Sequence, residues 1–403
     1  MNNSILNFST WLLSSLFYAY QMVLRVLPLL MADYLSRKVG MKAADIGLLA
    51  SIYYIGYALA HIPVGIALDK FRPKYTIMLS IGLCIYGIYL MTAAKVPFDV
   101  YLSRFIIGAG SVAGFLGAAK VTGEFYPKRF GLMLGLSISI GFLGAIYGAS
   151  PIADLLINSS PRQAMQALVL VAIILAASIW AAYNATPKNQ AKESYNIKDA
   201  LCKVLSNKDL WILGLVGGLL LGPLETFAGI WGIKFLTQIY NLREFQANYC
   251  INLILIGAAI GFPTFGFLTN FIKPRKIAIL LGISNVIIFT ILFSDIRLSI
   301  QTIFYLCFFI GMLTTHEICV FVTLTRNSNE NIVSLARALV NMIIMSFGFI
   351  YTFSIGYILH TFFESSSYTD LIYDSVAYRC AFGVMIIGMI IGVIGFTRAK
   401  IFD

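Results

Sequence analysis

Four ionisable side chains interrupt long apolar runs of this sequence: Arg25, Arg104, Glu225 and Glu317. A fifth titratable residue, His316, directly precedes Glu317. A charge inside an apolar segment is costly, and such residues usually bind a substrate, carry a proton or form an internal ion pair. These side chains are therefore the first candidates for function.

Arg25 lies in a polar stripe of its apolar run. Tyr18, Gln21 and Arg25 are spaced by three and four residues, so on a helix they share one face. A guanidinium keeps its proton and needs an anionic partner. We interpret Arg25 either as a contact for an anionic substrate or as one side of a structural ion pair with Glu225, and both interpretations stay open.

Two more residues belong to the candidate substrate site, and three to a candidate proton site. Arg104 lies near the outer end of its run, where it contacts substrate, pairs internally or snorkels to water. Trp231 is a candidate wall of a cavity. Glu225 follows a Gly-Pro pair that permits a bend, and we expect it to carry a proton, with Glu317 as second choice. His316 and Glu317 are adjacent and point to different sides of a helix.

The rest of the chain must hold these charges in an apolar surrounding. Of its 403 residues, 59% are hydrophobic and 12% are charged, which excludes a soluble enzyme and a disordered chain. Continuous apolar runs argue against a β-barrel. A spanning helix needs about 20 apolar residues, and we predict an all-α membrane protein with twelve spans, near 9–31, 44–68, 75–94, 99–121, 130–152, 163–185, 209–233, 246–270, 276–294, 301–324, 333–359 and 377–397.

An internal repeat divides the chain. At an offset of 201 residues the aligned pairs include Gly56 with Gly257, Gly65 with Gly266, Asp69 with Asn270 and Gly110 with Gly311. The same offset holds from the first to the fourth span of each half, and this indicates a duplication. We therefore predict an N-terminal six-helix half at 1–185, a linker at 186–208 and a C-terminal six-helix half at 209–403.

The net charge of +11 is explained by topology rather than by a nucleic-acid partner. Eighteen Lys and Arg residues flank the spans on the side of the linker and nine on the opposite side. Cytoplasmic loops carry the excess of positive charge. We expect both termini and the linker to be cytoplasmic, in a bacterial-type inner membrane.

The loop after the second span carries a recognisable motif. Gly65-x-x-x-Asp69-Lys70-x-Arg72-x-Lys74 resembles the signature of the major facilitator superfamily. The resemblance implies that Gly65 permits close helix packing and that Asp69, Lys70 and Lys74 form a cytoplasmic gate. Arg72 stands where the family usually has Gly, which places the local turn in question.

Two other stretches support this resemblance. Arg104-x-x-x-Gly108-x-Gly110 is similar to the family's pattern in the fourth span, and the stretch around Arg25 is similar to its organic-anion and sugar-phosphate branches. In the family, the first, fourth, seventh and tenth spans line a central cavity. All four intramembrane charges of this chain fall on those spans.

The expected function is secondary transport of a small polar or anionic organic solute by alternating access, with proton coupling, by a monomer. A drug or amphipath exporter, a facilitated-diffusion carrier, a polytopic membrane enzyme and a transporter-like sensor are the alternatives. We expect no enzyme activity, cofactor, metal or nucleic-acid partner, since no P-loop lysine, nucleophile triad or His/Cys cluster occurs. The six scattered cysteines are interpreted as small buried hydrophobes without a disulfide framework.

Overall fold

The computed structural model describes residues 3–41, 43–185, 196–294, 296–329, 331–363, 373, 375–399 and 401. Every regular element in these ranges is helical. Eleven helical segments are long and apolar enough to cross a membrane, and helix α1 (Asn3–Leu30) covers the remaining predicted span. The prediction of an all-α membrane protein with twelve spans is therefore confirmed.

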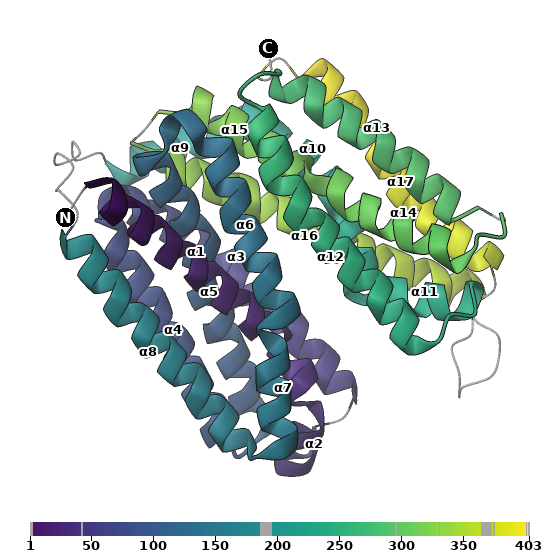
Figure 1. Cartoon of the computed structure of the whole chain (residues 1–403), viewed down its shortest axis with the longest axis horizontal. Helices are drawn as coiled ribbons and strands as arrows, with labels where there is room; N and C mark the ends of the chain where they lie inside the picture. The colour runs from purple at the N-terminus through teal and green to yellow at the C-terminus, as the bar shows by residue number, and fades with distance from the viewer. Residues whose placement is uncertain are drawn as a thin grey trace. The chain divides into compact units, whose positions relative to one another are not determined.

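The contacts between Cα atoms divide the chain into two compact units (Figure 1). Unit 1 comprises residues 1–206 and 328–338, and unit 2 comprises 207–327 and 339–403. Residues 328–338, which the sequence analysis assigns to the second half, thus group with unit 1. Of the predicted linker, residues 186–195 lie outside the described residues and the next part forms helix α9.

Unit 1 contains helices from each of its two segments, 1–206 and 328–338. They are α1, α2 (Ala32–Val39), α3 (Ala43–Lys70), α4 (Pro73–Ala93), α5 (Pro97–Phe125), the short η1 (Pro127–Arg129), α6 (Phe130–Tyr147), α7 (Ala149–Asn158), α8 (Pro161–Ala185), α9 (Ile197–Ser206) and the first turns of α16 (Val333–Phe363). Helix α5 packs against α1, α3, α4 and α6, and 83% of its membrane segment is buried. The fourth span is therefore the centre of this unit.

Unit 2 contains two interrupted spans. Its elements are α10 (Lys208–Thr226), the π-helical η2 (Phe227–Trp231), α11 (Gly232–Ile239), α12 (Glu244–Leu268), α13 (Pro274–Leu292), α14 (Ile300–Leu313), the 3-10 turn η3 (Thr314–His316), α15 (Glu317–Asn327), the rest of α16 and α17 (Ser375–Arg398). The α10–α11 and α14–α15 spans are each 72% buried. These seventh and tenth spans form the interior of unit 2.

Proline determines where several helices begin. Helices α4, α5, α8 and α13 all start at a proline, whose fixed φ suits the first helical position and whose missing N–H has no partner there anyway. Arg72 precedes Pro73 in extended conformation, with φ −61° and ψ 133°. This turn does not need glycine, so Arg72 in the motif is compatible with the fold.

The predicted register of the repeat is wrong in the fourth span. A Cβ atom on Gly56 would overlap the carbonyl oxygen of Phe105, and one on Gly257 would overlap that of Phe308. Gly56 of α3 and Gly257 of α12 are 201 residues apart along the chain, whereas the residues that they contact, Phe105 of α5 and Phe308 of α14, are 203 apart. Gly108 of α5 and Gly311 of α14 are also 203 residues apart, so Gly311 corresponds to Gly108. The longer connection at 293–299, compared with 94–96, accommodates the two extra residues.

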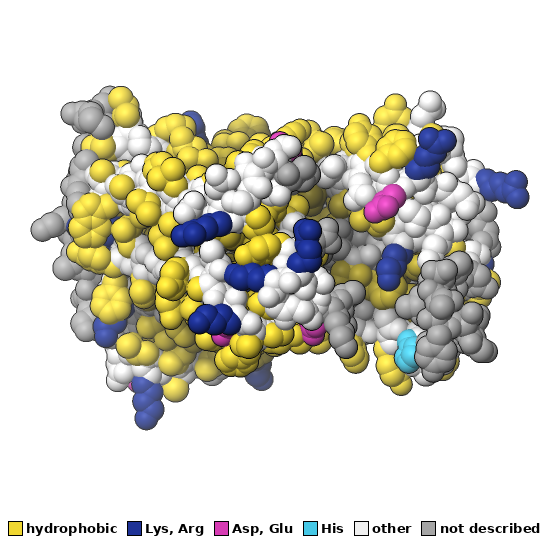
Figure 2. All heavy atoms as spheres, turned by 90° about the horizontal axis from the view of Figure 1, so that it is seen from below, with side chains coloured by type: hydrophobic (Ala, Val, Ile, Leu, Met, Phe, Trp, Pro, Cys, Tyr) yellow, Lys and Arg dark blue, Asp and Glu magenta, His cyan; other side chains and the backbone are white. Residues whose placement is uncertain are grey.

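Large hydrophobic side chains cover much of the outer surface. Figure 2 shows one face on which hydrophobic side chains are abundant and Lys and Arg side chains are few by comparison. Leu79, Phe98 and Tyr305 are each about two-thirds exposed, at 67%, 67% and 68%. Such exposure suits contact with lipid rather than with water.

Candidate functional site

Arg104 of α5 is completely buried against α1. Its Nη1 donates to the Leu24 carbonyl at 2.8 Å and its Nη2 to the Arg25 carbonyl at 3.2 Å. Pro28 lies four residues after Leu24 and has no N–H, so the helix itself leaves the Leu24 carbonyl without its usual donor. Arg104 supplies the missing hydrogen bond. Of the three expected roles, snorkelling to water is excluded by this burial.

Arg25 is half-buried, and its side chain reaches α3. Its Nη2 donates to the Tyr54 hydroxyl, and its guanidinium carbon lies 5.1 Å from the centre of the Tyr54 ring. The neighbouring Tyr53 ring lies 4.7 Å from the guanidinium of Arg104. Helices α1, α3 and α5 thus bring two arginines and two tyrosines together, and we call this group the arginine cluster.

Gln21 extends the arginine cluster by one turn of α1. Its Nε2 donates to the Tyr53 hydroxyl at 2.9 Å, while its buried Oε1 has no hydrogen-bond partner among the described residues. Tyr18, predicted on the same face, is separated from this group because its ring packs against Gly141 of α6 and lies 5.8 Å from the Phe115 ring. The structure therefore brings Gln21 and Arg25 together with Arg104, but not Tyr18.

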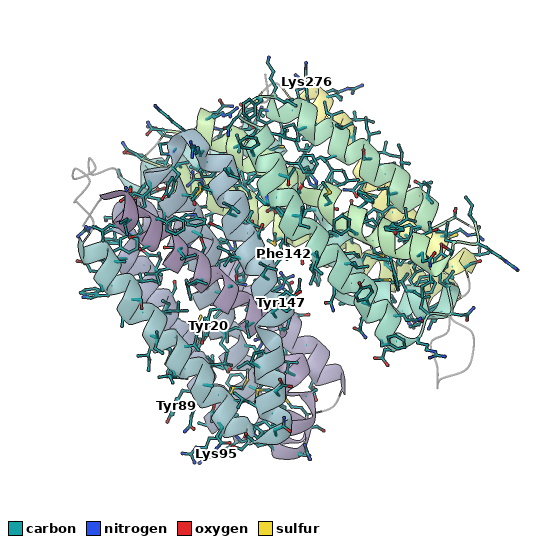
Figure 3. All side chains as sticks on the ribbon, in the orientation of Figure 1. Tyr20, Tyr89, Lys95, Phe142, Tyr147 and Lys276 are labelled. Carbon is teal, nitrogen blue, oxygen red and sulfur yellow. The ribbon has the colours of Figure 1, made fainter. Side chains whose placement is uncertain are left out.

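Tyr20 has a structural role in the same helix. Its hydroxyl donates to the Leu168 carbonyl at 3.1 Å and joins α1 to α8 (Figure 3). It is 5% exposed. The helix that carries Arg25 is thus held from two sides, by Tyr20 toward α8 and by Arg104 from α5.

Two carboxyl groups come together in unit 2. Glu225 of α10 is half-buried, and a Cβ atom on Gly348 of α16 would lie 3.2 Å from its Cβ. Glu317 is 6% exposed at the start of α15, and the two carboxyl groups are near enough to interact electrostatically. A glycine at 348 leaves room for the Glu225 side chain. Glu225 and Glu317 therefore form a carboxyl pair between α10 and α15.

His316 packs separately from the carboxyl pair. Its Nε2 lies 3.3 Å from the Gly217 carbonyl oxygen, its ring centre lies 6.3 Å from that of Phe396, and it is fully buried. The turn of 3-10 helix before Glu317 places the two adjacent side chains on different sides, as predicted. His316 contacts α10 two turns away from Glu225.

Trp231 lies at the end of the π-helical turn that follows Glu225. Its Nε1 donates to the Thr352 carbonyl at 3.3 Å, and Lys234 lies 5.3 Å from its ring. Thr226 donates to the Gly348 carbonyl at 3.1 Å. These bonds tie α10 and η2 to α16. π-helical turns of this kind are frequent at functional sites.

The motif residues form a third group in unit 1. The Asp69 carboxylate accepts hydrogen bonds from the backbone N–H of Ser334 at 3.2 Å and of Leu335 at 2.9 Å, both in the first turn of α16. Lys120 of α5 donates to it at 3.1 Å. Gly65 lies beside the same turn, where a Cβ atom would be 2.7 Å from that of Ala338. Asp69 therefore caps a helix N-terminus, which favours a negative charge.

Only part of the predicted gate meets at Asp69. Lys70 is exposed and lies 5.9 Å from the Phe71 ring. Lys74 is buried and lies 4.2 Å from the Trp180 ring of α8. The ring contacts of these two lysines are with Phe71 and Trp180, whereas the lysine that donates to Asp69 is Lys120.

Two basic residues beside Asp69, Lys120 and Arg337, are not among the residues predicted from the sequence. Lys120 is 2% exposed and Arg337 1% exposed. Arg337 donates to the Ala119 carbonyl at 3.1 Å and interacts electrostatically with Asp69. Lys120 falls inside the predicted span 99–121, and this position could have identified it as an intramembrane charge. It was counted only as a loop charge.

Comparisons with known proteins agree with this architecture. The family model described as Major Facilitator Superfamily matches residues 10–352. The uncharacterized transporter YybO of Bacillus subtilis (strain 168) is 24% identical over 297 residues, covering 60% of this chain and 68% of that protein. The nitrite extrusion protein of the same organism is 22% identical over 241 residues, covering 58% of each chain.

A solved structure shows the same fold. The crystal structure of the fucose:proton symporter FucP of E. coli superimposes with a TM-score of 0.68 at 18% identity, covering 95% of this chain and 98% of that one. At this identity the likeness is one of fold. The likeness of fold therefore extends over nearly the whole length of both chains.

Proposed function

The chain belongs to the Major Facilitator Superfamily, and from this premise we propose that it transports a small polar or anionic organic solute, coupled to protons. The coarser function, secondary transport, follows from the family and from relatives that are named transporters. The arginine cluster supports an anionic solute. The carboxyl pair supports proton coupling.

The proposal depends on one observation: the two arginines differ in burial and in the groups that they contact. Arg104 satisfies two carbonyls of α1 and is fully buried, whereas Arg25 is half-buried beside Tyr54. Arg104 therefore holds the backbone from which Arg25 projects. A guanidinium held in this way is suited to a carboxylate or another planar anion, because its fork binds two oxygens at once.

The relatives offer a limited parallel. The nitrite extrusion protein is named for export of an anion, although the chain matches only 58% of its length. FucP is named for symport of a neutral sugar with a proton. The two names differ in substrate and direction, so the solute proposed for this chain depends on the arginine cluster and the direction of transport is left open.

Ligand binding to Arg25 variants tests the anion proposal. Purified protein is screened by thermal shift against phosphate, nitrate, small mono- and dicarboxylates and neutral sugars, since a bound ligand raises apparent stability. Arg25→Lys should weaken binding of the best anion and keep the preference for anions, because the charge remains and the fork is lost. Arg25→Ala should remove most of the affinity.

The matched control for Arg25 is Arg37→Ala, which removes an exposed arginine of α2. It should leave anion binding unchanged. Tyr54→Phe removes the hydroxyl that accepts from Arg25 and should have an intermediate effect. Normal anion binding by Arg25→Ala would show that the anion site is elsewhere.

Transport under a pH gradient tests the proton proposal. A buried carboxyl group near a second one can bind or release a proton as its surroundings change. Glu225→Gln should keep exchange of internal for external solute and abolish uphill accumulation in proteoliposomes. Glu317→Gln is the second candidate. The control is Glu244→Gln, which changes an exposed carboxyl group in the first turn of α12. Uphill accumulation retained in both pair variants would show that these carboxyl groups do not couple transport to protons.

We also propose the orientation given by the Lys and Arg distribution. The Asp69 group, α9 and both termini would face the cytoplasm of a bacterial-type cell. In that orientation Asp69, Gly65 and Lys120 form part of the cytoplasmic gate, with Arg337 in place of the predicted Lys70 and Lys74. The protein would act as a monomer.

A further inference from the structure

Two buried thiols meet inside unit 2. Cys250 lies on α12 and Cys307 on α14, and neither side chain is exposed at all. The two thiols are near enough to interact electrostatically, and both are free in this structure. The candidate functional site uses neither. We call them the thiol pair.

The backbones of the two helices are close at this point. A Cβ atom on Gly311 of α14 would overlap the carbonyl oxygen of Ile254 of α12. Cys250 precedes Ile254 by four residues and Cys307 precedes Gly311 by four, so each thiol lies one turn away on the same face of its helix. A disulfide needs Cα atoms about 4.4 to 6.8 Å apart, and the backbone contact one turn away brings the two helices close at this level.

The fold itself does not require thiols at these positions. The offset of 201 residues for α3 and α12 places Leu49 opposite Cys250, and the offset of 203 for α5 and α14 places Arg104 opposite Cys307. Unit 1 thus packs the same helix pair with a leucine and an arginine. The thiol pair is a feature of unit 2 and not a consequence of the duplicated architecture.

We propose that Cys250 and Cys307 are a site of reversible thiol oxidation, at which a disulfide forms between α12 and α14. The oxidant would be a small membrane-permeant disulfide, for example dithiodipyridine. One thiolate attacks the reagent, which forms a mixed disulfide and releases one thiopyridone. The second thiolate then displaces the other thiopyridone, so one protein S–S bond forms and the two thiol protons leave on the two thiopyridones.

Peptide mapping of the full-length protein in its membrane tests the proposal. The membranes are treated with dithiodipyridine, and the remaining thiols are alkylated in denaturant before proteolysis and mass spectrometry. The expected product is a cross-linked peptide that contains both Cys250 and Cys307. Dithiothreitol should abolish it and restore two alkylatable thiols.

Single variants provide the matched control. In Cys307→Ala the Cys250 thiol has no partner to displace the second thiopyridone, so it should retain the pyridyl group, and Cys250→Ala should behave in the same way at Cys307. In the wild-type protein, two free thiols after prolonged treatment, or a separate pyridyl group on each cysteine, would overturn the proposal. The result does not depend on which solute is transported.

Discussion

At the scale of single residues, the function of a buried charge depends on which groups it satisfies. Arg25 and Arg104 have the same chemistry and both contact a tyrosine. Arg104 uses its two terminal nitrogens on backbone carbonyls, one of which Pro28 has deprived of its helix donor. Arg104 thus positions α1, and the Arg25 side chain projects from the part of α1 that Arg104 holds.

The role of Arg104 can be tested through Pro28. Arg104→Met removes the donor to the Leu24 carbonyl in the core of unit 1 and should destabilise the protein by about 1 to 3 kcal/mol, the cost of a buried polar group without a partner. Pro28→Ala restores an N–H four residues after Leu24. The double variant should therefore recover stability relative to Arg104→Met, as measured by thermal unfolding in detergent. No recovery would mean that Arg104 does not replace a helix hydrogen bond.

At the scale of elements, helix ends and helix interruptions carry the functional groups. Asp69 caps the N-terminus of α16, Glu317 begins α15 after a 3-10 turn, and Trp231 ends a π-helical turn. Each of these backbone features leaves N–H or carbonyl groups that another element must satisfy. Several candidate groups therefore lie where a regular helix stops, whereas Arg25 and Arg104 lie within helices.

Substitution of the α16 cap tests the role of this helix end. Asp69→Asn keeps an oxygen acceptor and loses the charge that faces both the helix N-terminus and Lys120. We expect the variant to lower the transport rate more than the affinity for solute, because Asp69 lies in the group around α16 and not in the arginine cluster. Lys70→Gln, which alters the exposed neighbour, should have little effect. A large loss of affinity with a normal turnover rate would contradict the assignment.

Hydropathy was sufficient to predict the spans, because the bilayer demands about 20 apolar residues wherever the chain crosses it. It could not predict the interruptions at 227–231 and 314–316, since a shift of backbone hydrogen bonds leaves the composition of a span unchanged. The intramembrane charges were also found from sequence. The tyrosines that contact the two arginines, Tyr53 and Tyr54, and the lysine that pairs with Asp69, Lys120, were not, because those contacts join different helices and depend on the packing of α1, α3 and α5.

At the scale of the whole molecule, the charge distribution sets the topology that we propose. The side of the linker carries the larger share of Lys and Arg, and the linker helix α9 exposes a native cysteine, Cys202. Lys95, labelled in Figure 3, is exposed in the connection from α4 to α5 on the opposite side. These two positions can report the orientation of the chain.

Labelling in intact cells tests the topology. In a variant that retains only Cys202, an impermeant maleimide should fail to react until the membrane is permeabilised. In a variant whose only cysteine comes from Lys95→Cys, the reagent should react in intact cells. Reaction of Cys202 before permeabilisation would reverse the assigned orientation.

The shift of register between the two units has a consequence for the history of the chain. Two residues were gained or lost in the connection before the fourth span of one copy, yet Gly108 and Gly311 still meet the backbones of Tyr53 and Ile254. The same contact between helices therefore occurs in both units, although the spacing along the polypeptide differs. Under the corrected register, Gly114, which lies against Gln21, corresponds to Glu317. The same position in the helix pair is thus a glycine packed against α1 in unit 1 and a carboxyl group in unit 2.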